Sequence, residues 1–209
     1  MTSPAAPRPS APASPPAPSP ATPPPSARPP LAHRWFFALK PDDVMAHRTH
    51  AFAAEQLGET GLLPPAHHHI TLALTPDFPD EPADLIAALL RAGDAVAAAP
   101  FTLHLDRLSG SARTVALRPS RAVPPLRALQ AAIAAAMAAQ GIAMRPDWRF
   151  SPHETLCYRK GAPFQRPVAG FHWSVTGFVL VHSVIGRHRH ETIGQWPLHA
   201  AEPAQGCLF

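Results

Sequence analysis

The sequence has few cysteines and no long apolar run, and each absence excludes a class of protein. Its two cysteines, Cys157 and Cys207, are too few for a disulfide framework and lack zinc-finger spacing, so we expect reduced thiols. No stretch reaches the roughly 18 apolar residues that span a bilayer, and the amino terminus has neither the basic start nor the apolar stretch of a secretory signal. A cytoplasmic protein with no membrane partner is the expectation.

Lysine is also scarce, because only Lys40 and Lys160 are lysines among the 18 basic residues. This bias, together with abundant alanine and proline, is typical of GC-rich coding. Without Arg8 and Arg28 near the amino terminus, 16 basic and 14 acidic residues remain. The sequence pI of about 9.8 therefore does not by itself indicate a nucleic-acid partner.

Proline is concentrated at the amino terminus, where the first 30 residues hold 13 of the 29 prolines and almost no apolar residue other than alanine. Such a segment cannot bury enough apolar surface to offset chain entropy. We predict a disordered Pro/Ala-rich tail at residues 1–32, a folded two-lobed domain at residues 33–199 and a second tail at residues 200–209.

The folded part shows strand and helix signals in a mixed order. Helical spacing of apolar residues predicts helices at 43–57, 81–99 and 124–140, the first beginning at Pro41-Asp42 and ending at Gly58. Apolar or alternating runs predict strands at 34–40, 68–75, 101–108, 113–119, 150–158, 172–183 and 190–198. This order is typical of the α+β class with mostly antiparallel sheets.

Two strands carry the same element, His-x-Thr-Leu, at residues 69–72 and 153–156. Residues two apart on a strand point to the same face, so His69 projects with Thr71 and His153 projects with Thr155. The matched pair predicts two similar lobes whose sheets line a central cleft, with the helices packed outside. Two imidazoles and two hydroxyls would then meet at one substrate group.

Such a group of side chains suits a phosphodiester. In-line attack on phosphorus needs a base beside the nucleophile, an acid beside the leaving group and donors to the non-bridging oxygens. Histidine can take either proton-transfer role near neutral pH, and the threonine hydroxyls can donate to the oxygens.

The pair HITL and HETL resembles the signature of the two-histidine phosphoesterases, the LigT-like superfamily. The run RWFFAL, the Pro-His before the second motif, and FVLVHS followed by a strand ending in WPL resemble its RNA 2',3'-cyclic phosphodiesterase (ThpR) branch. The resemblance spans residues 34–198. It implies a monomeric enzyme without metal or cofactor that opens the 2',3'-cyclic phosphate of RNA ends or nucleotides to a 2'-phosphate, with His153 as base and His69 as acid.

Three positions depart from the family pattern. Glu154 stands where an apolar residue is usual and points away from the cleft, so it needs a partner or an exposed edge. Arg159 lies one position later than the family's arginine, although strand alternation places it with His153 and Thr155, and we predict a phosphate contact. His190 stands near the place of a tyrosine.

Other residues are candidates for either a functional or a structural role. Phe36 and Phe37 point to opposite faces of the first strand, so one is a candidate for stacking on a base and the other for the core. Arg113 and Arg118 are expected to be ordinary surface arginines. His68 points away from the cleft and is expected to be structural or exposed.

Two alternatives to hydrolysis without a metal remain open. The three departures also fit a nucleotide- or RNA-binding module on the same fold without turnover. A metal hydrolase would use His67, His69 and His153 as zinc ligands, although this leaves the matched threonines unexplained.

Overall fold

The structure is a computed structural model that describes residues 31–187 and 189–199. The predicted tails lie outside these residues, apart from Leu31 and Ala32. The helices are α1 (Asp43–Leu57), the 3-10 helix η1 (Pro65–His67), α2 (Ala83–Asp94) and α3 (Pro124–Ala139). The strands are β1 (His33–Leu39), β2 (Ile70–Leu74), β3 (Phe101–Gly110), β4 (Thr114–Arg118), β5 (Glu154–Tyr158), β6 (Phe164–Val175), β7 (Gly177–Val184) and β8 (Arg189–Pro197).

All of these strands pair antiparallel in one sheet, in the order β6-β3-β4-β5-β2-β1-β7-β8. The predicted α+β class is confirmed. The two expected sheets are the two four-stranded halves of this sheet, because β2 and β5 are joined through one residue pair, Ile70 with Glu154. Each motif strand therefore lies at the inner edge of its half.

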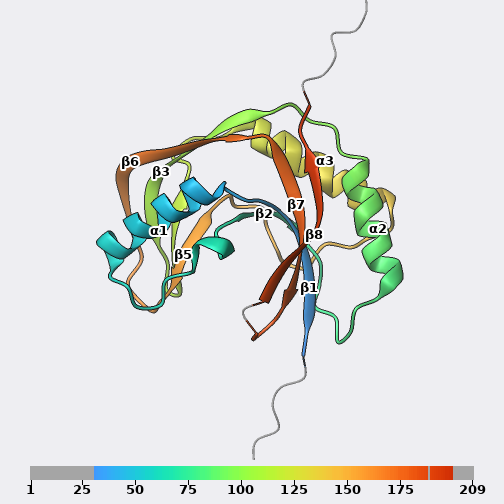
Figure 1. The fold of residues 1–209 in the computed structure, drawn as a ribbon, viewed down its shortest axis with the longest axis horizontal. Coiled ribbons are helices and arrows are strands. Elements are labelled where there is room, and N and C mark those ends of the chain that lie inside the picture. Colours follow the sequence, from blue (N-terminus) through green and yellow to red (C-terminus); the bar gives the residue numbers. More distant parts are fainter. Residues whose placement is uncertain (1–30, 188, 200–209) are drawn as a thin grey trace, which may run out of the picture.

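The sheet is strongly curled, as the connection between β6 and β7 requires. These strands are separated in the sheet order by five others, yet Thr176 alone separates them in the chain. One residue spans at most about 3.6 Å, so the end of β6 must lie beside the start of β7. Figure 1 shows β6 passing over the top of the molecule into β7.

Helix α1 has the ends that the sequence predicts. The Asp42 side chain accepts a hydrogen bond from the Met45 backbone N–H at 2.7 Å, and Gly58 caps the last turn with a φ of 76°. None of the helices in the described ranges is long and apolar enough to cross a membrane.

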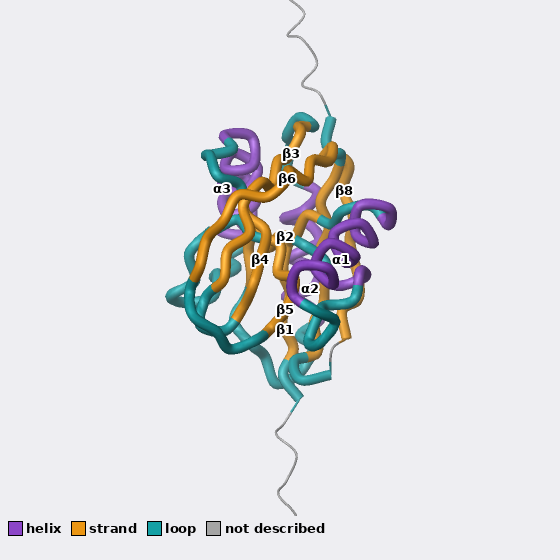
Figure 2. The backbone as a smooth tube through the Cα atoms, turned by 90° about the vertical axis from the view of Figure 1, so that its left-hand side faces the viewer, coloured by secondary structure: helices purple, strands orange, loops and turns teal. Residues whose placement is uncertain are grey.

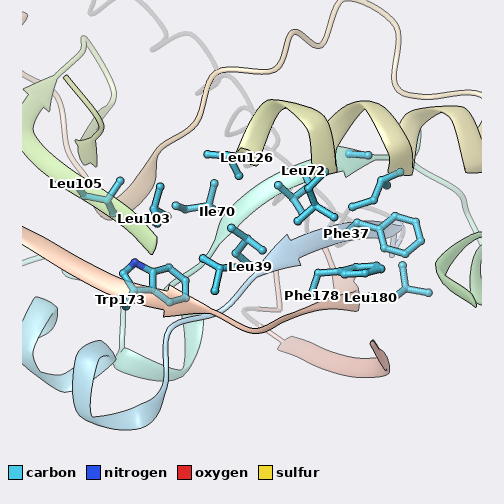
Figure 3. Close-up of a cluster of buried hydrophobic side chains, with 14 of the residues drawn as sticks. Phe37, Leu39, Ile70, Leu72, Leu103, Leu105, Leu126, Trp173, Phe178 and Leu180 are labelled. Atoms are coloured by element: carbon cyan, nitrogen blue, oxygen red, sulfur yellow. The ribbon is translucent and has the colours of Figure 1, made fainter. Parts of the chain in front are cut away.

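The main core lies between the outer face of the sheet and the helices, and it includes residues from α1, α2 and α3. Figure 2 shows the strands in the middle of the molecule with helices at its flanks. Figure 3 shows Phe37, Phe178 and Leu180 packed together in this core, near Leu72 on β2 and below α3. A smaller cluster lies on the other face of β1, β2 and β7 and comprises Phe36, Ala38, Leu74, Val179 and Val181.

Several predicted boundaries are wrong. The helix expected at 81–99 ends at Asp94, and the strand expected at 150–158 begins only at Glu154. The single strand expected at 172–183 is two strands, and β6 begins already at Phe164. β6 is an edge strand of the sheet, where a proline such as Pro167 is tolerated because one side of the strand needs no backbone partner.

Candidate active site

The register between β2 and β5 brings the four motif residues together. Ile70 pairs with Glu154, so one step along the antiparallel strands places His69 opposite Thr155 and Thr71 opposite His153. Ile70 and Glu154 are buried, whereas the four motif residues are partly exposed. The two imidazoles and two hydroxyls therefore share one face at the junction of the two halves, which we call the cleft.

Both motif histidines are held in the same way. The Nδ1 of His69 lies 2.7 Å from the backbone oxygen of His67, and the Nδ1 of His153 lies 2.6 Å from that of Ser151. A carbonyl oxygen only accepts hydrogen bonds, so each Nδ1 carries a proton and donates it. In the neutral rings, each Nε2 therefore keeps a lone pair for chemistry.

Burial lowers the pKa of both imidazoles in the free protein. It lowers the pKa of His69 from 6.5 to about 4; the bond to the His67 carbonyl opposes this, and the charges of His190 and His153 add to it. Burial also lowers the pKa of His153, with the Ser151 carbonyl opposing and the charge of Arg118 adding to the shift. Both rings are therefore neutral at pH 7.

Aromatic rings lie next to His69 in the half of the sheet that contains β2, β1, β7 and β8. The Phe36 ring lies 4.9 Å from the His69 ring, and His190 lies 5.7 Å from His69 and 4.6 Å from His67 between ring centres. A cavity of about 120 Å³ opens here. It is lined by Leu63, His67, His69, Tyr158, Ser183, Val184, Gly186 and His190.

The two phenylalanine candidates lie on opposite faces of β1, as expected. Phe37 is 1% exposed and packs against Phe178 and Trp196 in the main core, so it cannot stack on a base in this conformation. Phe36 is 6% exposed and packs against the His69 ring, so it supports that imidazole.

A β-bulge moves Arg159 away from the motif residues. Strand β4 pairs with β5 through Ala116 with Thr155 and Val115 with Cys157, which leaves Leu156 as an extra residue. A bulge shifts the alternation of side chains by one position.

The exposed Tyr158 consequently takes the cleft side, where it lines the cavity beside His69. The Arg159 guanidinium instead donates to the backbone oxygen of Leu57 at 3.3 Å, at the end of α1. The placement of Arg159 beside His153 and Thr155 therefore does not hold.

Arg118 lies where Arg159 was expected. Leu117 pairs with Glu154, so the next step along β4 and β5 places Arg118 opposite His153. Its side chain is partly buried, which lowers its pKa, and its guanidinium donates to the Ser151 hydroxyl at 2.8 Å. Among the described residues no carboxylate forms an ion pair with it.

A cavity of about 280 Å³ lies beside the segment that precedes His153, and its lining includes Arg118, Arg121 and Arg127 together with Ser151 and Pro152. Local sequence gives no signal for this cluster. Its position depends on how β4 pairs with β5 and on where α3 begins.

Glu154 finds its partner in His68, on the core side of the same strand pair. The two side chains are 1% and 0% exposed, and His68 Nδ1 lies 2.7 Å from the Glu154 carboxylate. The other ring nitrogen of His68 lies 3.3 Å from the Leu63 backbone oxygen. The structural role expected for His68 is confirmed, and the pair links the two motif strands directly behind the candidate site.

The cleft histidines do not form the group of metal ligands considered above. Within the described ranges, one group of three ligating side chains has converging donor atoms, and it comprises His33, Glu81 and His182.

Solved structures share this fold. E. coli LigT in complex with 3'-AMP is 25% identical, with a TM-score of 0.66 over 81% of this chain and 99% of LigT. LigT in complex with NADP+ is 26% identical, with a TM-score of 0.64 over 80% and 98% of the two chains. TT0787 of Thermus thermophilus, at 24% identity, has the same fold, with a TM-score of 0.65 over 81% of this chain and all of TT0787.

No curated protein sequence matches the chain significantly. The sequence itself is assigned through a family model, which matches residues 41–184 and so includes both motif strands. Together with the shared LigT fold, this match shows that the chain belongs to the 2'-5' RNA ligase superfamily, the LigT-like phosphoesterases.

Proposed function

We propose that the protein is a metal-independent cyclic phosphodiesterase of the RNA 2',3'-cyclic phosphodiesterase (ThpR) type. It opens the 2',3'-cyclic phosphate of an RNA end or nucleotide and leaves a 2'-phosphomonoester. The observation that carries this proposal is the matched pair His69 and His153, each with Nδ1 fixed on a carbonyl and a threonine opposite. One chain supplies both histidines, so a monomer has the whole site.

The reaction needs two proton transfers on opposite sides of phosphorus. A water oxygen attacks the phosphorus and gives a proton to the Nε2 of one histidine. The bond from phosphorus to the 3' oxygen breaks, and that oxygen takes a proton from the Nε2 of the other histidine. The two Nε2 atoms are the available ones because both Nδ1 atoms already donate to carbonyls.

The pKa order supports His69 as the base and His153 as the acid, the reverse of what the family resemblance implies. Protonating a histidine with a pKa of about 4 costs about 4 kcal/mol at pH 7. His153 has the smaller shift and is easier to protonate. The negative charge of a bound phosphodiester would raise both pKa values and offset part of this cost.

Three donors are available for the phosphoryl oxygens. Thr71 and Thr155 lie opposite the two histidines and can donate their hydroxyl protons. Arg118 lies across from His153, and one of its five N–H groups donates to the Ser151 hydroxyl. A partly buried guanidinium without a carboxylate partner favours an anion, and donors of this kind stabilise charge that develops in the transition state.

The arginine-lined cavity next to Ser151 and Pro152 supports a substrate with more than one phosphate. Arg121 and Arg127 line it together with Arg118, so the next phosphate of an RNA strand would meet positive charge there. E. coli LigT has been solved with 3'-AMP and with NADP+, which supports nucleotide binding in the same fold. We propose RNA ends as the preferred substrate and free nucleotides as smaller ones.

The alternative of a binding module without turnover loses its motivation. Glu154 is paired with His68, Arg118 lies opposite His153 where a phosphate contact is needed, and Tyr158 lies beside His190 in the cavity. None of these departures removes a donor or a proton carrier from the cleft.

The test is to incubate the protein in EDTA with 2',3'-cyclic AMP and with an oligonucleotide that ends in a 2',3'-cyclic phosphate. Phosphorus NMR then distinguishes a 2'-phosphate from a 3'-phosphate. His69→Ala and His153→Ala should each lower kcat by about 10²- to 10⁴-fold. His172→Ala, on the exposed side of β6, is the control. Unchanged turnover in the variant that lacks both cleft histidines would refute the proposal.

A leaving-group experiment tests which histidine is the acid. A p-nitrophenyl phosphodiester needs no proton on its leaving oxygen, so the variant without the acid should recover activity on it relative to the cyclic substrate. We expect this recovery in His153→Ala and not in His69→Ala. Recovery in His69→Ala alone would reverse the assignment.

A further inference from the structure

Three metal-ligating side chains converge across the sheet from the cleft. His33 begins β1, at the lower end of that strand in Figure 1, His182 lies on β7, and Glu81 precedes α2. One donor atom from each lies within 4.8 Å of the others. His33 lies two residues before Trp35 and so on the same face of β1, and Trp35 belongs to the main core. Trp35 pairs with His182, so that residue lies on this face as well. The group is therefore separated from His69 by the sheet.

The three donor atoms of this group cannot all satisfy one another through a single proton. The Nδ1 of His33 lies 2.9 Å from the Nε2 of His182 and 3.4 Å from a carboxylate oxygen of Glu81. A neutral imidazole nitrogen has either one proton or one lone pair. If Nδ1 donates to His182, the half-exposed Glu81 carboxylate is left to water; if Nδ1 accepts from His182, its lone pair faces the carboxylate. A divalent cation would satisfy all three atoms together.

Two of the three donor–donor separations lie near the spacing around a small tetrahedral ion, and the third is at most 4.8 Å. Two ligands at about 2.0–2.1 Å from a tetrahedral zinc ion lie about 3.4 Å apart. The separation of His33 Nδ1 from Glu81 Oε1 already has this value, at 3.4 Å. The two ring nitrogens, at 2.9 Å, need to separate by about 0.5 Å to reach the tetrahedral spacing.

The surrounding structure holds these ligands in place. The Trp35 ring stacks on the His182 ring with centres 4.9 Å apart and planes within 8°, which restrains that imidazole. His33 and Phe78 exchange two backbone hydrogen bonds of 2.7 and 2.8 Å, which fix the loop that carries Glu81 beside β1. His33 and His182 are buried, whereas the Glu81 side chain is 52% exposed and leaves a way in for an ion and a water.

We propose that His33, Glu81 and His182 bind one zinc ion, with water as the fourth ligand. Two imidazole nitrogens and one carboxylate oxygen are a donor set that suits zinc. The ion would join the loop before α2 to the ends of β1 and β7. Because the sheet separates it from the cleft, its role is structural and hydrolysis would continue when it is removed.

Zinc binding to the full chain, purified without a histidine tag and stripped with EDTA, tests this site. Titration with ZnCl2 is followed by calorimetry, and Tm is measured with and without zinc. We expect one ion per chain and a higher Tm with zinc. Glu81→Gln, at a half-exposed position that should tolerate the change, should weaken binding by about 100-fold or more, because even losing a residue that only orients a ligand costs about 10- to 100-fold.

The control variant is His190→Asn, which removes an imidazole from the other cluster of histidine rings, beside His69. It should keep the wild-type zinc affinity, whereas His182→Gln should lose it. If His182→Gln does not fold, the zinc-dependent rise in Tm of Glu81→Gln decides alone. A wild-type chain that binds no zinc, or a Glu81→Gln variant with unchanged affinity, would overturn the proposal.

Discussion

The buried pair of His68 and Glu154 allows a quantitative test of how the two halves of the sheet are held together. His68→Leu leaves the Glu154 carboxylate, 1% exposed, without the ring nitrogen that lies 2.7 Å away. Leaving a buried carboxylate without its partner costs about 3–5 kcal/mol. This is a large part of the roughly 5–15 kcal/mol that stabilises an ordinary domain.

The reverse change, Glu154→Leu, leaves a smaller defect. It removes the acceptor of His68 Nδ1 and leaves a buried donor unsatisfied, which costs about 1–3 kcal/mol. Replacing both residues by leucine removes both unsatisfied groups, and such apolar replacements are often neutral or stabilising by about 1–4 kcal/mol. The double variant should therefore be more stable than His68→Leu alone.

The assay is a double-mutant cycle in which urea denaturation gives the free energy of unfolding of the four proteins. The single-variant costs and a neutral double variant together give an expected coupling of about 4–8 kcal/mol between the two positions, above the roughly 0.5–3 kcal/mol that is usual for residues in contact. Glu55→Leu, at an exposed position on α1, is the control and should change stability by about 0.5 kcal/mol or less. Additive effects of His68→Leu and Glu154→Leu would refute the reasoning, because they would mean that the contact between the two side chains carries no energy.

Three further predictions concern activity and packing. The pH profile of kcat/KM should be bell-shaped, because the base must be neutral while the acid is protonated. Both pKa values should lie below 6.5 and the lower one near 4, because burial lowers the pKa of His69 to about 4 and also lowers that of His153. Arg127→Ala should lower kcat/KM for an oligonucleotide more than for 2',3'-cyclic AMP and should reduce the slope of log affinity against log salt for the oligonucleotide by about 0.7. Gly93→Ala should lower the free energy of unfolding by about 1–3 kcal/mol despite the helix preference of alanine, because its methyl group would overlap the Trp196 ring, and thermal unfolding measures this loss.

The two substitutions among these predictions each have a matched control. The salt slope for the oligonucleotide should stay unchanged in Arg187→Ala, an exposed arginine beyond β7. Gly161→Ala adds a methyl group that meets nothing within 4 Å and should leave Tm nearly unchanged. A pH profile with both limbs above 6.5, or a stabilising Gly93→Ala, would contradict the packing that lowers the pKa values or surrounds Trp196.

Local sequence was sufficient for the ends of α1 and the faces of the motif strands. Asp42 and Gly58 define α1 because a capping side chain and a glycine with positive φ act within a few residues. The alternation of Ile70 with His69 and Thr71 follows from the twofold repeat of an extended chain. These features need no knowledge of the rest of the molecule.

Positions that depend on pairing between distant strands could not be read in this way. One extra residue in β5, visible only against β4, turns Arg159 away and brings Tyr158 to the cavity. Arg118 is an ordinary arginine in the sequence and comes opposite His153 only through the β4–β5 register. β6 tolerates Pro167 because that strand is at an edge, which is a property of the whole sheet.

The sequence by itself therefore determined the two His-x-Thr strands, the faces on which their side chains lie and the α+β class, since these follow from short-range periodicity and family resemblance. The tertiary structure alone decided the partner of Glu154, the lowered pKa values of His69 and His153, and the meeting of His33, Glu81 and His182. The physical reason is that burial and register arise from contacts between segments far apart in the chain, and no local pattern records them.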